Sequence, residues 1–208
     1  LNDAKKKGYA EANPLSDLNG EDVAAKLKIL SSLCFNSYIN HNIHIEGINH
    51  IDKIDIDNAN KLGYKIKLLG VSEIINNKVY QRVHPTLIKK SSYIASIDGV
   101  LNAVITDGKP AGQSVIQGEG AGPEATTSAL ISDISSILRG NVKFPFSISN
   151  KEKRKLNFMN ISDRSFSAYL RFEVIDKPGV LSDITKIFSI NKVSIKILIQ
   201  NPNKSKKY

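Results

Sequence analysis

Hydrophobic residues recur at helical spacing near the start of the chain, and they predict a helix over residues 21–36. Carboxylates occupy its first turn, where the helix dipole favours negative charge, and Asp17 or Asn19 would cap it. The apolar stripe of this helix consists of Val23, Leu27, Leu30 and Cys34. Because Cys34 lies on that stripe, we expect a buried and unreactive thiol.

Two pairs of β-rich segments follow, and each pair is predicted to form a hairpin. The predicted strands are, in chain order, 64–75, 78–84, 100–106 and 113–117. Asn76-Asn77 would form the first turn and Asp107-Gly108 the second. A short strand at 43–48 and helices at 55–62 and 123–139 complete this region.

The chain changes character after residue 140. Residues 141–166 contain a proline, repeated Ser and Asn, and a basic run, so we expect a linker. The elements predicted beyond it are a strand at 167–175, an amphipathic helix at 180–189 and a strand at 193–199. We therefore predict an α+β fold: a mixed β-sheet with helices packed on it over 1–140, then a truncated ferredoxin-like βαβ module over 167–208.

Composition narrows the function classes. The chain has 208 residues, of which 41% are hydrophobic and 24% charged, as in an ordinary globular protein. No apolar run approaches the ~18–20 residues of a membrane span, so no membrane partner is expected. The net charge is +9, but nearly all cations are Lys and the basic runs lack interleaved aromatics, which disfavours nucleic acid. The single cysteine fits a reducing, cytoplasmic compartment.

The candidate chemistry lies at the start of the chain. Asp22 and Lys26 are four residues apart, so they share a helix face. The simplest interpretation is an exposed ion pair, which contributes little stability. However, the turn-rich segment before the helix can bring Glu11 and Asp17 towards its first turn. A lysine held near carboxylates can transfer a proton, and further carboxylates can hold an ammonium group. This chemistry suits a small zwitterionic amino acid.

A glycine-rich loop, Gly120-Ala121-Gly122, lies between an apolar strand and a helix. With the residues that follow, it fits the letters of the dinucleotide fingerprint, but no acidic residue ends a strand about 20 residues further on. The loop could contact an anion at the helix N-terminus or serve as a tight packing turn. The four histidines lack the spacing of metal ligands, so no metal site is expected.

The opening segment resembles the signature of the homoserine dehydrogenase family. The matching positions are Ala4, Gly8, Tyr9, Ala10, Asn13, Pro14, Asp17, Leu18, Gly20, Asp22 and Lys26. Segments 82–87, 98–103 and 120–122 resemble the same family in the same order, so the resemblance covers residues 1–140. Residues 167–208 resemble the first half of an ACT domain, through 174–181. Such domains sense amino acids.

The resemblance implies NAD- or NADP-dependent interconversion of L-homoserine and L-aspartate 4-semialdehyde, in threonine and methionine biosynthesis. Lys26 would transfer the proton and Asp22 would orient it. The residues expected to bind substrate are Gly8, Glu11 and Asp17, and those expected to approach the cofactor are Gly120, Ala121 and Gly122.

The same resemblance places the family's nucleotide-binding domain ahead of this segment. We therefore expect the chain to be a fragment that is inactive alone, and its parent to be a cytoplasmic homo-oligomer, with a dimer as the simplest case. An amino acid such as threonine would be the effector. The alternative is a non-catalytic regulatory module that binds amino acids through its ACT-like segment.

Overall fold

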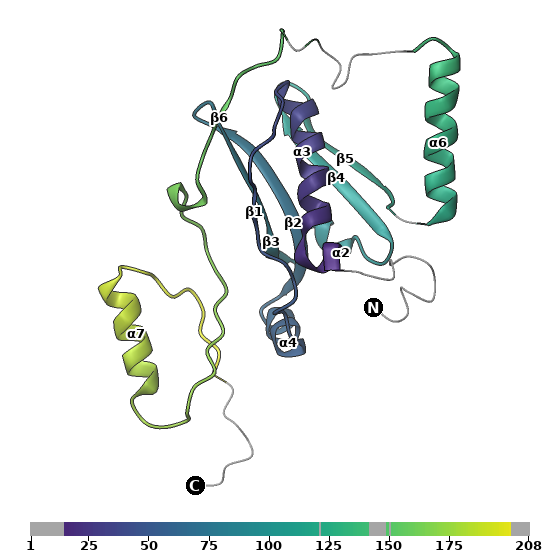
Figure 1. The fold of residues 1–208 in the computed structure, drawn as a ribbon. Helices are drawn as coiled ribbons and strands as arrows, with labels where there is room; N and C mark the ends of the chain where they lie inside the picture. The colour runs from purple at the N-terminus through teal and green to yellow at the C-terminus, as the bar shows by residue number, and fades with distance from the viewer. Residues whose placement is uncertain (1–14, 121, 142–148, 150, 201–208) are drawn as a thin grey trace. The chain divides into compact units, whose positions relative to one another are not determined.

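The structure is a computed structural model that describes most of the chain (Figure 1). The described residues are 15–120, 122–141, 149 and 151–200. The chain falls into two compact units, Leu1–Ser167 and Ala168–Tyr208, and each unit is considered by itself. The first unit combines helices with parallel and antiparallel strands, in agreement with the predicted α+β class.

Two helices open the described part of the first unit. The short helix α2 (Leu15–Asn19) leads into α3 (Glu21–Phe35), which confirms the helix predicted here. Gly20 joins them in the left-handed conformation, at φ 84°, and caps α3 without a side-chain hydrogen bond. The predicted cap by Asp17 or Asn19 is therefore wrong, because the chain turns at a glycine, which adopts positive φ without steric cost.

The central sheet has the strand order β1-β3-β2, and β6 also pairs with β3. β2 (Tyr64–Ile75) and β3 (Lys78–Lys89) form the predicted antiparallel hairpin. Asn76 and Asn77 make its turn with φ of 49° and 60°. Asparagine tolerates this left-handed region better than most residues, and two consecutive positive φ angles match the twist of a hairpin.

Strand β3 continues beyond its predicted end, through Pro85. On one side β2 pairs with it along its whole length, and Pro85 lies opposite Leu68. On the other side β1 (His44–Ile45) pairs only with Arg82 and Val83. Within the described residues Pro85 therefore lies beyond β1, where its missing N–H removes no strand pairing.

Part of the segment expected to be a linker packs on this sheet. β6 (Asn157–Phe158) pairs in parallel with the start of β3, and Leu156 is buried beside Ile39 and Val79. The first compact unit accordingly extends to residue 167. An apolar side chain and two backbone pairings are enough to hold a polar segment against a sheet edge, and the composition of the segment gave no sign of this.

Helix α3 lies close against the sheet because two glycines lack side chains (Figure 1). A Cβ on Gly70 of β2 would lie 3.1 Å from Val23 and 3.4 Å from Leu27. A Cβ on Gly20 would lie 3.1 Å from side chains of both β1 and β3. The buried apolar residues of this layer are Ala24, Leu27, Ile43 and Val83.

The second predicted hairpin is also present. β4 (Leu101–Gly108) pairs antiparallel with β5 (Gly112–Glu119). The strands extend through the predicted turn at Asp107-Gly108, and the loop lies at residues 109–111. Beyond the hairpin, Gly122 caps α6 (Pro123–Leu138), the third predicted helix.

Two further helices flank the sheet segments. α4 (Lys53–Lys61) begins with a capping box formed by Asp52 and Asp55. The single-turn helix α5 (Tyr93–Ser96) precedes Asp98. The Asp98 carboxylate lies 2.8 Å from Lys65 Nζ and 2.6 Å from Lys67 Nζ of β2, so this ion cluster attaches the α5 segment to the sheet.

The second unit contains the predicted helix, α7 (Val180–Ile190). The two strands predicted around it are not formed: residues 168–175 and 193–199 have no strand pairing in the described part. Alternating side chains supply an apolar face, but a strand also needs a neighbouring backbone to satisfy its N–H and C=O groups. The ferredoxin-like βαβ arrangement is therefore present only as its helix.

We expect Gly70→Val to destabilise the first unit by about 1–3 kcal/mol, because the added methyl groups would force α3 away from β2. Urea unfolding would measure the change. Gly108→Ala is the matched control, because a Cβ there meets nothing within 4 Å and the loss should be below about 0.5 kcal/mol. Equal midpoints for Gly70→Val and the parent chain would show that α3 does not depend on this close approach.

A second prediction concerns Asp98, whose pKa falls to about 2 because Lys65 and Lys67 donate hydrogen bonds to it. The folded-state pKa lies below the ordinary value of 3.8, so the ionised group stabilises the fold above about pH 4 and this contribution is lost as the pH falls towards 2. An NMR titration should therefore find the Asp98 midpoint well below 3.8. Lys65→Met should raise that midpoint, whereas Lys61→Met should leave it in place.

Candidate functional site

Helix α3 brings the two principal candidates together. Lys26 Nζ donates a hydrogen bond to Asp22 Oδ2 over 2.6 Å, and the side chains are 58% and 38% exposed. Their helix face points away from the buried face that carries Ala24 and Leu27. The pair is therefore held in one orientation at the start of α3 while remaining accessible to a small molecule.

The third described candidate, Asp17, lies in α2 just before this pair. Its side chain is exposed, and its carbonyl accepts a hydrogen bond from the N–H of Gly20 over 3.3 Å. This bond closes the turn that joins α2 to α3. The three carboxylate and ammonium groups of Asp17, Asp22 and Lys26 thus belong to one short stretch of backbone whose course the glycine fixes.

Two substrate-binding candidates, Gly8 and Glu11, lie outside the described residues, as does Ala121 of the cofactor candidates. The structure therefore gives no position for them, and their roles stay predictions.

The segment that follows β1, which the sequence did not single out, contacts α2 next to the candidate residues. The N–H of Ile48 donates to the carbonyl of Leu18 over 2.9 Å, and the Asn49 amide donates to Asn19 Oδ1. Gly47 lies so close to Leu18 and Asn19 that no side chain would fit there. The segment following β1 thus holds α2 in place. The only signal in the sequence was one glycine, which is too common to be diagnostic.

The glycine loop has a packing role that the sequence left open. A Cβ on Gly120 would collide with the side chain of Asn102 in β4. Gly122 has φ 114°, which L side chains rarely adopt, and it caps α6. Both glycines are therefore required by the local fold, and their expected contact with a cofactor stays a prediction.

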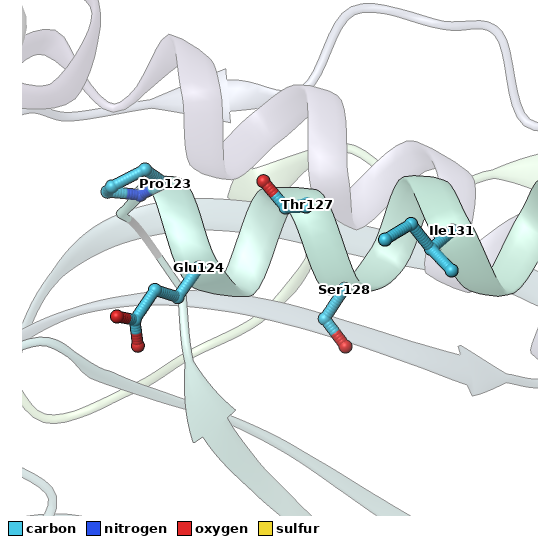
Figure 2. Close-up of a pocket in the computed structure, with 5 residues that line it drawn as sticks. All are labelled: Pro123, Glu124, Thr127, Ser128 and Ile131. Carbon is cyan, nitrogen blue, oxygen red and sulfur yellow. The ribbon is translucent and has the colours of Figure 1, made fainter.

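A shallow groove lies beside the first turns of α6 (Figure 2). Its lining residues are Pro123, Glu124, Thr127, Ser128 and Ile131. All five come from one helix, so the groove is a feature of the surface rather than an enclosed cavity. None of the predicted catalytic or substrate-binding residues lines it.

The outward face of α3 differs from the expectation in one respect. Cys34, predicted to be buried, is exposed. Ile29 and Leu33 are also exposed, at 53% and 47%, and they continue the helix face that begins with Asp22 and Lys26. In the last turns of α3 the buried residues are Ser31 and Ser32, whereas the apolar pattern predicted Leu30 and Cys34.

The segment 82–87, which carried part of the resemblance, has its polar side chains on the other face of the sheet. Arg82 and His84 alternate with Val83, which packs under α3. The Arg82 guanidinium lies 4.7 Å from the ring centroid of Phe166. Burial lowers the pKa of His84, whose Nδ1 lies 2.8 Å from the Pro85 carbonyl oxygen. Because Val83 packs under α3, Arg82 and His84 lie on the face of the sheet opposite that helix.

Among the described residues, no helix is long and apolar enough to cross a membrane. In the same part of the chain, no three His, Cys, Asp or Glu side chains are grouped as metal ligands would be.

The family model described as homoserine dehydrogenase matches residues 1–135. The chain belongs to this family. Its relatives include the homoserine dehydrogenases of Neisseria gonorrhoeae, 37% identical over 207 residues, and Helicobacter pylori, 38% identical over 201 residues. Each alignment covers 96% of this chain, and 48% and 47% of the two relatives. The chain thus spans about half the length of the curated relatives it matches.

Solved structures agree. A homoserine dehydrogenase from Thiobacillus denitrificans superposes with a TM-score of 0.80 at 33% identity, over 96% of this chain and 48% of the other. The homoserine dehydrogenase of S. aureus gives a TM-score of 0.62 at 39% identity, over 68% of this chain and 36% of the other. The fold described above is therefore that of one part of a homoserine dehydrogenase.

Proposed function

We propose that this chain is the substrate-binding and proton-transfer part of an NAD- or NADP-dependent homoserine dehydrogenase, which interconverts L-homoserine and L-aspartate 4-semialdehyde. The observation that carries the proposal is the Asp22–Lys26 pair, held over 2.6 Å at the start of α3 in a chain that the family model matches through residue 135. An exposed i, i+4 ion pair adds little to stability, so the proposal gives this pair a chemical role rather than a structural one.

The reaction requires both a hydride and a proton to move, and the described residues can act on the proton. Lys26 transfers it to the aldehyde oxygen in reduction and takes it from the hydroxyl in oxidation. Asp22 accepts a hydrogen bond from Lys26 Nζ and so keeps the ammonium directed to one place. Glu11 and Asp17 bind the amino group and hydroxyl of the substrate.

The described residues do not fit a complete dinucleotide site. Most of their strands pair as antiparallel hairpins, whereas dinucleotides bind to parallel strand–helix units. The loop of Gly120–Gly122 would approach the cofactor from one side only. We therefore place the main cofactor site in another part of the enzyme, in line with the half-length match to the relatives.

An exposed apolar face on α6 supports the placement of the cofactor site in another part of the enzyme. The residues of α6 that carry it are Leu130, Ile131, Ile134, Ile137 and Leu138, each between 57% and 82% exposed. Apolar faces of this size normally pack on another surface. We infer that α6 packs on the remaining part of a longer enzyme.

By its resemblance to the family, we also infer that this enzyme is a cytoplasmic homo-oligomer in threonine and methionine biosynthesis.

The second unit is proposed to be an ACT-type module that senses an amino acid such as threonine. Its helix α7 and the turn at 178–179 support this, whereas the two strands that such a module needs are not formed. The alternative of a purely regulatory, non-catalytic protein is not favoured, because the family match covers the catalytic segment and the relatives are named as dehydrogenases.

A hybrid enzyme tests the proposal. The part of the N. gonorrhoeae relative that has no counterpart here would be joined ahead of Leu1 and assayed for NADPH oxidation with L-aspartate 4-semialdehyde. We expect turnover from the hybrid and none from the chain alone. A folded hybrid that binds NADPH but shows no turnover would contradict the proposal.

In the hybrid, Lys26→Ala should lower kcat by about 10²-fold or more, because the reaction loses its acid–base group. Lys28→Ala is the matched control: it removes a lysine from the same helix on a different face and should keep near-normal turnover. A near-normal kcat in Lys26→Ala would contradict the proton-transfer role.

Glu11→Ala in the same hybrid should raise the KM for L-homoserine at least about tenfold with a smaller change in kcat, because a charge-paired hydrogen bond to the amino group is lost. Glu21→Ala, which removes an exposed carboxylate from the first turn of α3, serves as the control. An unchanged KM would remove Glu11 from the binding site.

A further inference from the structure

The last turns of α3 meet the sheet through three polar side chains instead of apolar ones. Ser31 Oγ donates a hydrogen bond to Ser72 Oγ over 2.8 Å. The Gln81 amide donates to Ser31 Oγ over 2.7 Å and to Ser72 Oγ over 3.1 Å. One residue comes from α3, one from β2 and one from β3, and Ser72 lies directly opposite Gln81 in the strand register. We call this set the polar triad.

Stability does not explain the polar triad. Ser31 and Gln81 are 3% and 5% exposed, so both groups have been removed from water. Gln81 Oε1 is buried and has no hydrogen-bond partner among the described residues. A buried polar network that is only partly satisfied costs free energy, and apolar side chains of the same shape would be as stable or more stable.

The polar triad adds directional hydrogen bonds to the interface. Near its N-terminal end α3 rests on Gly70 through Val23 and Leu27, and this contact sets how closely the helix approaches. The burial of apolar side chains is itself non-directional, so only close packing opposes a small rotation of the helix or a slide along its axis there. Hydrogen bonds weaken steeply as their angle departs from linearity, so the bonds to Ser31 resist both movements.

The rotation of α3 matters because Lys26 lies on it, just over one turn before Ser31. If the helix rotates about its axis, Lys26 and Asp22 rotate with it through the same angle, so their side chains are displaced around the helix. A displacement of about 1 Å in a catalytic group can lower turnover by about 10²-fold. We propose that Ser31, Ser72 and Gln81 are positioning residues that fix the rotation and axial position of α3 and thereby hold the Asp22–Lys26 pair in its catalytic orientation; this inference rests on the function proposed above.

Two variants of Ser72, to threonine and to valine, have side chains of the same shape and differ in whether they carry a hydroxyl. Ser72→Thr keeps the hydroxyl, whereas Ser72→Val has the same outline without it, and both residues suit a strand. In the hybrid enzyme, Ser72→Val should lower kcat about tenfold or more while KM changes less than about twofold. Ser72→Thr should retain most of the wild-type kcat.

Ser32→Ala is the matched control for burial. Ser32 is as buried as Ser31, at 3% exposed, but among the described residues its hydroxyl bonds to the Lys28 carbonyl and the Ile39 N–H and not to the sheet. We expect Ser32→Ala to lower Tm and leave kcat within about twofold, because the helix keeps its bonds to the sheet. Ser72→Val should lower Tm as well, because the buried Ser31 hydroxyl loses its acceptor. The loss of kcat is what separates it from Ser32→Ala.

A measurement on the 208-residue chain needs no catalysis. Cys34 is its single cysteine, lies on α3 and is exposed, so a spin label attaches there without substitution. With a second label at Lys89→Cys on β3, electron paramagnetic resonance gives the distribution of helix-to-strand distances. Ser72→Val should broaden or shift this distribution, and Ser72→Thr and Ser32→Ala should not.

The outcomes decide the two proposals separately. An unchanged distance distribution in Ser72→Val, or an unchanged kcat despite a shifted distribution, overturns the positioning role. Normal turnover in Lys26→Ala overturns the proposed function instead, and the distance measurement then still decides whether the polar triad fixes α3.

Discussion

Helix α3 can pack directly on the sheet because Gly70 leaves the space that Val23 and Leu27 fill, and because Gly20 lets the chain turn into the helix against β1 and β3. The distance between helix and sheet follows from these two positions. The buried layer beneath the helix then determines which face of α3 remains outside. Asp22 and Lys26 are on that outer face, so the candidate site depends on a packing constraint formed by residues that have no chemistry of their own.

Two kinds of contact, apolar and hydrogen-bonded, hold α3 on the sheet, and each contributes something different. Apolar contacts near Gly70 bring the helix and the sheet together and supply the favourable free energy of burial. The polar triad further along the helix contributes direction, at a cost in desolvation. The segment after β1 adds a third support, because it bonds to α2 and keeps Asp17 beside the start of α3. Asp22 and Lys26 are exposed, so the position of their backbone depends on this support beneath the helix.

Local patterns predicted the elements well where local physics decides them. Helix α3, the Asn76-Asn77 turn and both hairpins follow from residue spacing and turn preferences, and the structure contains all of them. The failures share one cause. The packed linker segment, the exposed Cys34 and the extension of β3 through Pro85 each depend on which neighbour a residue meets, and a neighbour distant in the chain leaves no local pattern.

The sequence by itself determined the family, because the spacing of the opening segment is long and specific. It also placed Asp22 and Lys26, the residues proposed to transfer the proton, on one helix face, because an i, i+4 pair must share a face. It also determined the order of helices and hairpins. Only the tertiary structure decided how α3 is held, through glycines at close approach and a buried serine–glutamine cluster whose members are 41 and 50 residues apart from Ser31 in the chain. Those contacts arise from the pairing of helix and sheet, and directional hydrogen bonds can act only after folding has brought their partners together.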